Sequence, residues 1–502
     1  MFDPSGAGTA YASPDAHAPR AASAPPVASA AHAIDALSWI ETRASLPYFV
    51  DGAGAAWTPI GQNDAVGWPE FDGLFRRRDL PGVEAHLHRL RASGVTCLRL
   101  MLEYAQGEHR YLEKPVGRFV PNMVRLWDDL FAMCERVGLR ILLTPFDTFF
   151  TWTRWGRHPY NVKNGGPCSS RRRLLTCSDT REAIKARLEF ATRRWGTSGV
   201  LFGWDLWNEA HPAHGGDDPG VVARFIDDVG PWLRTLELDV HGRAHPQTVS
   251  IFGPELLRHP QLADPIFRSS ALDFANTHLY ESATIDNPRD TIAPALATAR
   301  LMRDAVLHAA DGRPVFDSEH GPIHAFKDRR RTLPEDFDDE YFRHMQWAHL
   351  ASGGAGGGMR WPNRNPHVLT GGMRAAQAAL SRFLPLIDWT RFRRTNLNDE
   401  VTSSDPRVAI CACGDADQAI VWMLRTDTKT RGGVIARHAK PLPIRVIVPS
   451  LAAGAFHVRC FDTRLGIVRR DDMVEAGSGM TLEAEVSTDL VLAIQRKGDT
   501  AV

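Results

Sequence analysis

The chain has 502 residues, with 59 lysines and arginines balanced by 59 aspartates and glutamates. Its length exceeds one ordinary domain, although an α/β barrel of about 250 residues or more counts as a single domain. The balanced charge gives no overall field toward nucleic acid or an anionic membrane, so we expect neither as a partner. A neutral substrate suits this composition.

The first segment, residues 1–33, is rich in alanine, serine, proline and glycine, and we expect it to be a disordered tail. It lacks the basic start and the apolar run of a secretory signal peptide. No stretch approaches the roughly 20 apolar residues that a membrane span needs. These features favour the cytoplasm, although a mis-assigned start or another export route would leave the same pattern.

Apolar strand-like runs alternate with amphipathic helical stretches from about residue 45 to residue 386, which is the pattern of β/α units around a parallel sheet. The strand candidates lie near residues 57–61, 96–101, 140–145, 201–207, 248–253, 274–279, 314–318 and 356–361. The helical candidates between them include 82–93, 123–137, 180–195, 221–238, 293–310 and 340–351. This order predicts an α/β protein with a (β/α)8 TIM barrel over residues 34–390.

The last part of the chain, residues 391–502, has a different pattern. Short alternating runs lie near residues 407–413, 418–424, 444–448, 456–461 and 490–495, and turn-forming residues separate them. This spacing predicts a C-terminal antiparallel β-sandwich domain. Its single tryptophan, Trp422, lies inside one of the runs. An exposed aromatic strip is therefore not evident, and we expect a structural domain packed on the barrel.

Two acidic motifs each follow an apolar run. The sequence WDLWNE ends at Glu209, and the sequence VFDSEHG contains Glu319. Parallel barrels place their catalytic groups at the carboxyl ends of the strands, where both motifs would lie. Two carboxylates are the minimum for cleaving a glycosidic bond, because one protonates the departing oxygen while the other attacks or stabilises the sugar cation.

Other polar and aromatic residues follow predicted strands in a specific order. They are Arg99 at the second strand, Asn208 and Glu209 at the fourth, His278 and Tyr280 at the sixth, Glu319 at the seventh and Trp361 at the eighth. Each is a weak signal alone, but the order and the spacing together are specific. On these residues the region from about residue 45 to residue 386 resembles clan A glycoside hydrolases, and most of all family 5, which contains many cellulases and mannanases.

The resemblance implies a retaining β-glycosidase in which Glu209 is the acid/base and Glu319 the nucleophile. Such an enzyme would hydrolyse β-linked neutral polysaccharides or oligosaccharides, with β-1,4-mannan or glucan as the first candidates. Retaining hydrolysis needs two carboxyls about 5 to 5.5 Å apart. No cofactor is expected, because proton transfer and a covalent glycosyl-enzyme suffice. A transglycosylase would use the same glutamates, and a catalytically silent polysaccharide-binding barrel is the alternative outside enzymes.

The resemblance also implies supporting roles for polar residues. Arg99 would keep Glu319 ionised, Tyr280 would hydrogen-bond the same carboxylate, and His278 would line the same subsite. Asn208 would donate to the sugar 2-hydroxyl, a contact that tightens in the transition state. The alternative for each is an ordinary structural role, such as a paired charge, a satisfied core histidine or a turn cap.

Three tryptophans are candidates for sugar stacking. Trp361 would offer a flat apolar face to a sugar ring, and Trp152 and Trp155 could extend that platform, although tryptophans are more often part of a core. The chain departs from the family pattern at Asp147, where many relatives have a histidine, and at His211, which lies between the acid/base and the next proline.

No metal site is expected. His86 and His88 form an H-x-H pair, but they lie in a helical stretch, where residues two apart point about 200° from each other. His320 and His324 have helical spacing, but Pro322 interrupts them. The seven cysteines include no C-x-x-C pair, so zinc-finger and redox motifs are not expected. Cys168 and Cys177 are either two free thiols or a disulfide.

Overall fold

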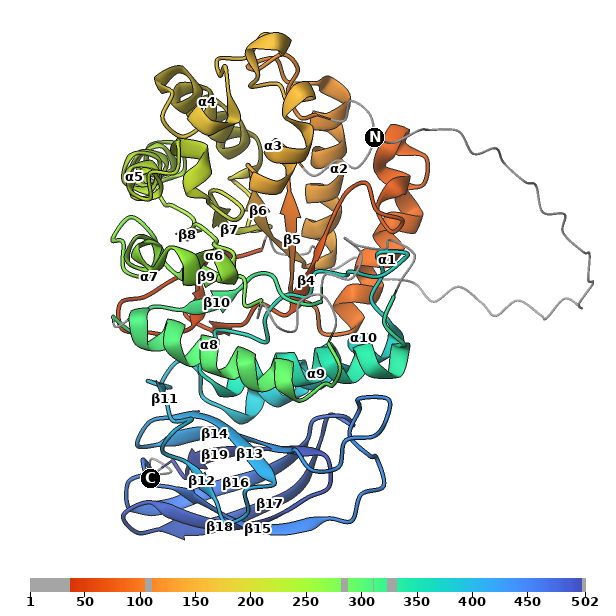
Figure 1. Cartoon of the computed structure of the whole chain (residues 1–502), viewed down its shortest axis with the longest axis vertical. Coiled ribbons are helices and arrows are strands. Elements are labelled where there is room, and N and C mark those ends of the chain that lie inside the picture. The colour runs from red at the N-terminus through yellow and green to blue at the C-terminus, as the bar shows by residue number, and fades with distance from the viewer. Residues whose placement is uncertain (1–36, 104–110, 281–287, 310, 323–331, 499–502) are drawn as a thin grey trace, which may run out of the picture. The chain divides into compact units, whose positions relative to one another are not determined.

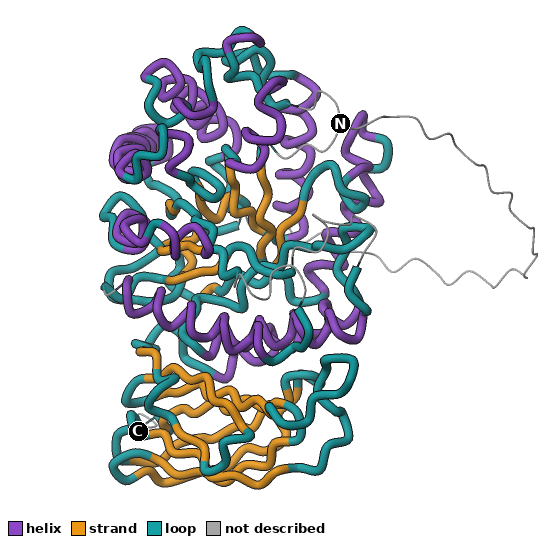
Figure 2. Tube along the Cα trace, viewed as in Figure 1, coloured by secondary structure: helices purple, strands orange, loops and turns teal. Residues whose placement is uncertain are grey.

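The computed structural model describes residues 37–103, 111–280, 288–309, 311–322 and 332–498. The predicted tail of residues 1–33 lies outside the described residues, and so does His324. Figure 1 shows the arrangement of the elements, and Figure 2 shows the same view by secondary structure.

Parallel strands form the inner part of the α/β region (Figures 1 and 2). Five pair in the order β4-β5-β6-β7-β8, and β9 pairs with β10 in a second parallel sheet. The strands are β4 (Gly61–Asp64), β5 (Cys97–Met101), β6 (Arg140–Thr144), β7 (Leu201–Asp205), β8 (Gln247–Thr248), β9 (Ala275–Thr277) and β10 (Val315–Asp317). All residues of β5, β6 and β7 are buried, which explains their continuous apolar runs.

Single parallel bridges extend this pairing beyond the strands. Phe252 pairs with His278, just after β8 and β9. Arg360 pairs with both His320, just after β10, and Gln62 of β4. The pairings therefore run from β4 through β8, β9 and β10 and return to β4 through Arg360.

Three predicted strands need correction. The first begins at Gly61 and not at Trp57, because Trp57 belongs to a small antiparallel sheet of β1 (Ile40–Glu41), β2 (Phe49–Asp51) and β3 (Ala56–Trp57). The fifth contains only Gln247–Thr248. The eighth is reduced to the bridge at Arg360, because Gly356 and Gly358 have φ of 148° and 72°, outside the usual strand region.

Helices follow the parallel strands along the chain. They are α1 (Leu80–Ala92), α2 (Pro121–Val137), α3 (Thr148–Arg154), α4 (Ser178–Trp195), α5 (Gly220–His241), α6 (Gly253–Arg258), α7 (Ala263–Phe267), α8 (Ala293–Ala309), α9 (Glu335–Ala351) and α10 (Gly371–Phe383). The 3-10 helices are η1 (Asp72–Arg77), η2 (Trp155–Arg157), η3 (Val162–Asn164), η4 (Arg171–Arg173), η5 (Pro212–Gly215), η6 (Pro260–Leu262) and η8 (Leu384–Leu386). Helix α2 shows why helix boundaries can be predicted from the sequence. Pro121 is its first residue, and Gly138, in the left-handed conformation, ends it.

Helices α2, α4 and α5 pack apolar side chains onto the strands. Trp127 of α2, Leu188 of α4 and Phe225 of α5 share a hydrophobic cluster with Leu98 of β5 and Ile141 of β6, and all five are fully buried. Burial of these side chains is the main stabilising contribution to this layer. It fixes the strand ends, from which the polar residues of the site extend.

The C-terminal part contains two antiparallel sheets. The larger has the order β11-β13-β14-β19-β16-β17 and the smaller the order β12-β15-β18. The strands are β11 (Thr395–Asn396), β12 (Thr402–Ser403), β13 (Val408–Gly414), β14 (Gln418–Arg425), β15 (Leu442–Val448), β16 (Gly454–Asp462), β17 (Ile467–Ala476), β18 (Met480–Val486) and β19 (Asp489–Arg496). Val421 of the larger sheet and Val446 and Leu482 of the smaller lie in one hydrophobic cluster. The two sheets therefore share a core.

Trp422 of β14 is fully buried, and its indole donates to Asp489 at 3.2 Å. It shares a hydrophobic cluster with Trp347 of α9 and Phe383 of α10. Arg343 of α9 also donates to Asp489, at 3.3 Å. The larger antiparallel sheet is thus packed against helices of the α/β region.

Cys168 and Cys177 are free thiols, as are the other five cysteines. Among the described residues, no helix combines the length and the apolar character that crossing a membrane requires.

Candidate active site

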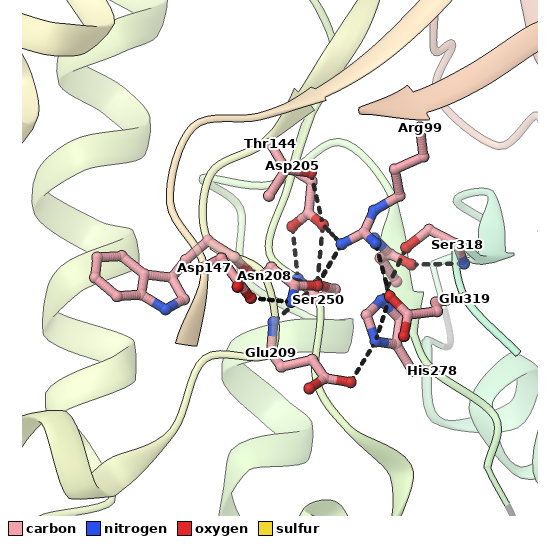
Figure 3. Close-up of polar contacts among 12 residues, drawn as sticks. Arg99, Thr144, Asp147, Asp205, Asn208, Glu209, Ser250, His278, Ser318 and Glu319 are labelled. Carbon is pink, nitrogen blue, oxygen red and sulfur yellow. Dashed lines mark hydrogen bonds and ion pairs between the residues drawn. The ribbon is translucent and has the colours of Figure 1, made fainter. Parts of the chain in front are cut away.

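Arg99 lies at the centre of a buried cluster of charged and polar side chains (Figure 3). It extends from the middle of β5, and its side chain is inaccessible to solvent. One guanidinium nitrogen, Nη1, donates to Asn63 Oδ1 at 2.8 Å and to Glu319 Oε2 at 2.9 Å. The other, Nη2, donates to Asp205 Oδ2 at 2.7 Å and to Asn208 Oδ1. The guanidinium therefore fixes side chains from the ends of three strands, β4, β7 and β10, in one plane of donors.

Asp205, the last residue of β7, is a supporting acid. It accepts hydrogen bonds from the backbone N–H and the hydroxyl of Ser250, each at 2.9 Å, in addition to the bond from Arg99. The Ser250 hydroxyl also accepts the backbone N–H of Glu209 at 3.1 Å. Asp205 is fully buried, so it holds the cluster together and does not face solvent.

Glu209 lies four residues beyond the end of β7 and has a left-handed backbone with φ of 51°. Residues other than glycine adopt this conformation at a cost of about 1 kcal/mol or more, and such residues are frequent at functional sites. Its carboxylate Oε1 lies 2.8 Å from Nδ1 of His278, and its side chain is 21% exposed. The carboxylate is therefore held by one partner and still reaches solvent.

Glu319 lies two residues beyond β10. Its Oε1 accepts the hydroxyl of Tyr280 at 2.9 Å, and its Oε2 accepts Arg99. Its backbone N–H donates to Asp317 Oδ1 at 3.3 Å, so Asp317 is a hydrogen-bond acceptor behind Glu319. Glu319 thus receives a cation and a hydroxyl donor, whereas the partner of the Glu209 carboxylate within the described part of the chain is a histidine.

His278 connects the two glutamates. Its ring is fully buried, with Nδ1 2.8 Å from Glu209 and 3.8 Å from Glu319, while Nε2 lies 3.1 Å from the Ser318 hydroxyl. Burial lowers the pKa of His278 to about 4, so the ring is neutral at neutral pH. The neutral form satisfies both contacts if Nδ1 donates to Glu209 and Ser318 donates to Nε2.

The two glutamates lie close together. One carboxylate oxygen of Glu209, one of Glu319 and a ring nitrogen of His278 all lie within 4.8 Å of one another. Burial raises the pKa of each glutamate to about 7. Two acids at this distance disfavour double ionisation, so the pair retains a proton near neutral pH and can serve both as a proton donor and as a nucleophile.

Asn208 is held on both sides. Its Oδ1 accepts Arg99, and its Nδ2 donates to Asp147 Oδ1. Asp147 also caps α3 by accepting the backbone N–H groups of Phe149 and Phe150. An amide has two N–H donors, so one donor of Asn208 remains for another acceptor. Asp147, the position at which the chain departs from the family pattern, thus supplies the acceptor that orients Asn208.

The three predicted stacking residues occupy different surroundings. Trp361 is half-buried, and its ring lies edge-on to Trp68 at 5.2 Å between centroids. Trp152 of α3 is half-buried and lies edge-on to the His211 ring at 4.9 Å. Trp155 stacks on His158 at 5.7 Å and packs against the largest hydrophobic cluster.

In the part of the chain that the structure describes, two sets of side chains have donor atoms close enough for one metal ion. One is the glutamate and histidine set just described, and the other is Asp317, His320 and His349. In the second set His349 Nε2 lies 2.6 Å from Asp317 Oδ2, whereas two ligands on one tetrahedral zinc lie about 3.3 Å apart. In the first set Arg99 supplies a positive charge against Glu319. Neither set fits an ion in this arrangement.

Several members of the cluster were not identified from the sequence. Asn63 was not predicted because the first strand was placed too early in the sequence. No residue at the actual end of β4 was therefore considered as a site candidate. Ser250 gave no signal, since a serine near a strand end is common. His86 and His88 behave as predicted, with His86 buried and His88 exposed on opposite sides of α1.

No protein-family model matches the chain, and no curated protein matches its sequence. The fold is nevertheless shared with solved glycoside hydrolases, including a member of family 5. That family 5 structure, from Bacteroides vulgatus ATCC 8482, matches with a TM-score of 0.59 and 10% identity over 92% of this chain and 94% of its own. A second structure, titled glycoside hydrolase, matches with a TM-score of 0.57 and 12% identity over 93% of this chain and 98% of its own.

Proposed function

We propose that this protein is a retaining β-glycosidase that hydrolyses β-linked polysaccharides or oligosaccharides, with Glu209 as acid/base and Glu319 as nucleophile. The observation that carries the proposal is the approach of the two carboxylates to within 4.8 Å. Retaining enzymes have carboxyls about 5 to 5.5 Å apart, whereas inverting enzymes need about 6.5 to 9.5 Å to seat a water molecule between them.

We infer that the parallel strands close into a (β/α)8 barrel that carries a C-terminal β-sandwich. The return of the strand pairing to β4 through Arg360 supports this closure. The fold likeness to glycoside hydrolases supports it as well. In such a barrel the carboxyl ends of all strands meet at one mouth, which is where the two glutamates would face a substrate.

The contacts favour one distribution of the shared proton. Arg99 and Tyr280 both donate to Glu319, and both interactions stabilise its ionised form. Among the described residues, Glu209 has no cation in contact and is paired with the neutral His278. The proton therefore resides on Glu209, which makes Glu209 the acid and Glu319 the nucleophile.

Hydrolysis then proceeds in two displacements. In the first, a Glu319 oxygen forms a bond to the anomeric carbon while the bond to the leaving oxygen breaks and Glu209 gives that oxygen its proton. In the second, Glu209 takes a proton from water, whose oxygen attacks the anomeric carbon and releases Glu319. The remaining N–H of Asn208 is available to the sugar 2-hydroxyl, and Trp361 to the face of the ring.

The deciding experiment is a panel of β-linked polysaccharides, beginning with β-1,4-mannan and glucan, assayed for new reducing ends. NMR on the first product should show the anomeric configuration of the substrate retained, and Glu319→Ala should release nothing. An inverted first product would contradict the mechanism. An activated aryl β-glycoside that is bound but left intact would indicate a silent binder, and products longer than the substrate would indicate transglycosylation.

A further inference from the structure

The segment from Trp152 to Cys177 carries a strong local charge, and we refer to it as the basic loop. It contains six lysines and arginines and neither aspartate nor glutamate, in a chain whose total charges balance at 59 each. The six are Arg154, Arg157, Lys163, Arg171, Arg172 and Arg173, and all of them are exposed. A composition averaged over the whole chain hides this concentration.

The charges of the basic loop are largely uncompensated. Among the described residues, Arg172 is the one member of the six that forms an ion pair, at 3.6 Å from the exposed Asp217. Some exposed arginines elsewhere are closely paired, such as Arg194 with Asp128 at 2.6 Å and Arg407 with Asp405 at 2.6 Å. The loop therefore combines a purely basic composition with little ion pairing.

The basic loop lies against the segment that follows Glu209. Helix η4 (Arg171–Arg173) packs on η5 (Pro212–Gly215), which begins three residues after Glu209. The backbone carbonyl of Arg171 lies 3.1 Å from Nδ1 of His214, and the carbonyl of His214 accepts the N–H of Leu175 at 3.0 Å. These contacts anchor the loop beside the acid/base.

A row of side chains leads from the loop toward the acid/base. The Arg171 guanidinium lies over the Trp152 ring at 5.5 Å, and that ring lies 4.9 Å from the ring of His211, two residues after Glu209. His211 Nε2 in turn lies 3.2 Å from Glu255 Oε2. An acid/base protonates the departing oxygen, so the leaving part of a substrate lies on the side of Glu209. Arg171 is therefore positioned at the leaving-group end of the site.

We propose that the basic loop binds anionic groups on the leaving-group portion of the substrate, so that the substrate is an acidic β-linked glycan carrying carboxylate or sulfate groups. The inference rests on the proposed function. Arginine forks match the geometry of carboxylate and sulfate oxygens and hold them by paired charge-assisted hydrogen bonds. Unpaired rim cations also raise the local concentration of an anionic ligand before it docks.

The test compares one anionic glycan with its neutral counterpart. A β-1,4-glucan oligosaccharide, its carboxylated form and its sulfated form are assayed for kcat/KM with the full chain and with the variant Arg171→Gln/Arg172→Gln/Arg173→Gln. We expect the full chain to prefer at least one anionic form, and the carboxylated and sulfated arms identify which group is recognised. The triple variant should lower the ratio of anionic to neutral kcat/KM about tenfold or more, since each exposed charge contributes about two- to fivefold.

The matched control is Arg407→Gln/Arg469→Gln/Arg470→Gln, which removes three exposed arginines from the C-terminal sheets and should leave that ratio unchanged. Raising the ionic strength should reproduce the effect of the loop variant on the anionic substrates. Equal activity of the full chain on neutral and anionic forms, or a ratio that the loop variant does not change, would overturn the inference. Anionic phospholipid vesicles bound through the loop with no effect on glycan kinetics would also overturn it, and would indicate a membrane surface.

Failure of the inference can be told apart from failure of the proposed function. An activated aryl β-glycoside without a leaving sugar tests hydrolysis alone. If the full chain leaves both this compound and all oligosaccharides intact, the glycosidase proposal fails. If the aryl glycoside is cleaved but charge on the oligosaccharide has no influence, the acidic-substrate inference alone fails.

Discussion

The hydroxyl of Tyr280 donates to Glu319 Oε1 at 2.9 Å. Burial raises the pKa of Tyr280 well above 10, so the phenol keeps its proton across the working range and remains a donor. A donor to a carboxylate stabilises the ionised form and so opposes the effect of burial on the pKa of Glu319. The ionisation of Glu319, the proposed nucleophile, consequently depends on a residue that lies just beyond β9.

The change Tyr280→Phe should therefore raise the pKa of Glu319. A hydrogen bond to a charged group contributes about 1.5 to 3 kcal/mol, which corresponds to a shift of roughly one to two pH units. The acidic limb of the kcat/KM profile should move to higher pH, and activity below pH 7 should fall about tenfold or more. Tyr160→Phe is the control, because Tyr160 donates to the carbonyl of Ala183 and not to the site. An unchanged profile in Tyr280→Phe would rule out this role.

Glu209→Ala should distinguish substrates by their leaving groups. An aryl glycoside with a good leaving group needs little protonation, so its cleavage should be spared, while natural substrates should lose about 100-fold or more in rate. Added azide should react with the glycosyl-enzyme and give a β-azide product, detectable by NMR. Glu319→Ala serves as the comparison, because the absence of the nucleophile should abolish both activities. Equal loss on both substrates in Glu209→Ala would count against Glu209 as the acid.

The folding stability of the protein should depend on the ionisation of Glu209. Its pKa is raised from 4.5 to about 7 in the folded state, so protonated Glu209 stabilises the fold below about pH 4.5, and this contribution is lost as the pH rises through about 7. Glu209→Gln removes the buried charge. The variant should be more stable than the wild type by about 1 to 3 kcal/mol at pH 8 and similar to it at pH 4.

Urea unfolding at the two pH values measures this difference. Glu182→Gln is the control, because the Glu182 side chain is 75% exposed and its replacement should give no gain at either pH. A Glu209→Gln variant with the same stability difference at pH 4 and pH 8 would contradict the raised pKa.

Arg99→Lys should destabilise the fold although the charge is kept. A lysine ammonium cannot reproduce the two-nitrogen fork that reaches Asn63, Glu319, Asp205 and Asn208, so buried acceptors lose their donors. Breaking a buried charge pair costs about 3 to 5 kcal/mol, and we expect a loss in that range together with loss of activity. The exposed Arg407→Lys should change the unfolding free energy by less than about 1 kcal/mol. A loss below about 1 kcal/mol for Arg99→Lys would show that the network contributes little.

The helices and the central strands could be predicted because their sequences carry local signals. The predicted helix at 123–137 agrees closely with α2, which has a proline at its start and a glycine just past its end. The predicted strands at 96–101 and 140–145 agree with β5 and β6, because strands buried on both faces are continuously apolar.

Other elements could not be read from local pattern. Strand β17 is mostly exposed and rich in charge, so it has no apolar alternation, and it forms because it pairs along β16. The eighth parallel segment is interrupted by Gly356 and Gly358, whose backbone conformations no strand pattern reveals. The eighth segment thus depends on a partner distant in sequence, Gln62, whereas β17 depends on its pairing with the neighbouring β16.

The sequence alone identified the candidate site residues, through the order of Arg99, Asn208, His278, Tyr280 and Glu319 along the chain and the placement of Glu209 after a buried strand. Only the tertiary structure decided that Asp205 is a support, that Asp147 orients Asn208, and that the basic loop lies beside the segment that follows Glu209. The physical reason is that the proton affinity of a carboxyl depends on burial and on neighbouring charges, and those neighbours come from strands far apart in the chain. Residue identity is local, whereas the environment of each side chain exists only after folding.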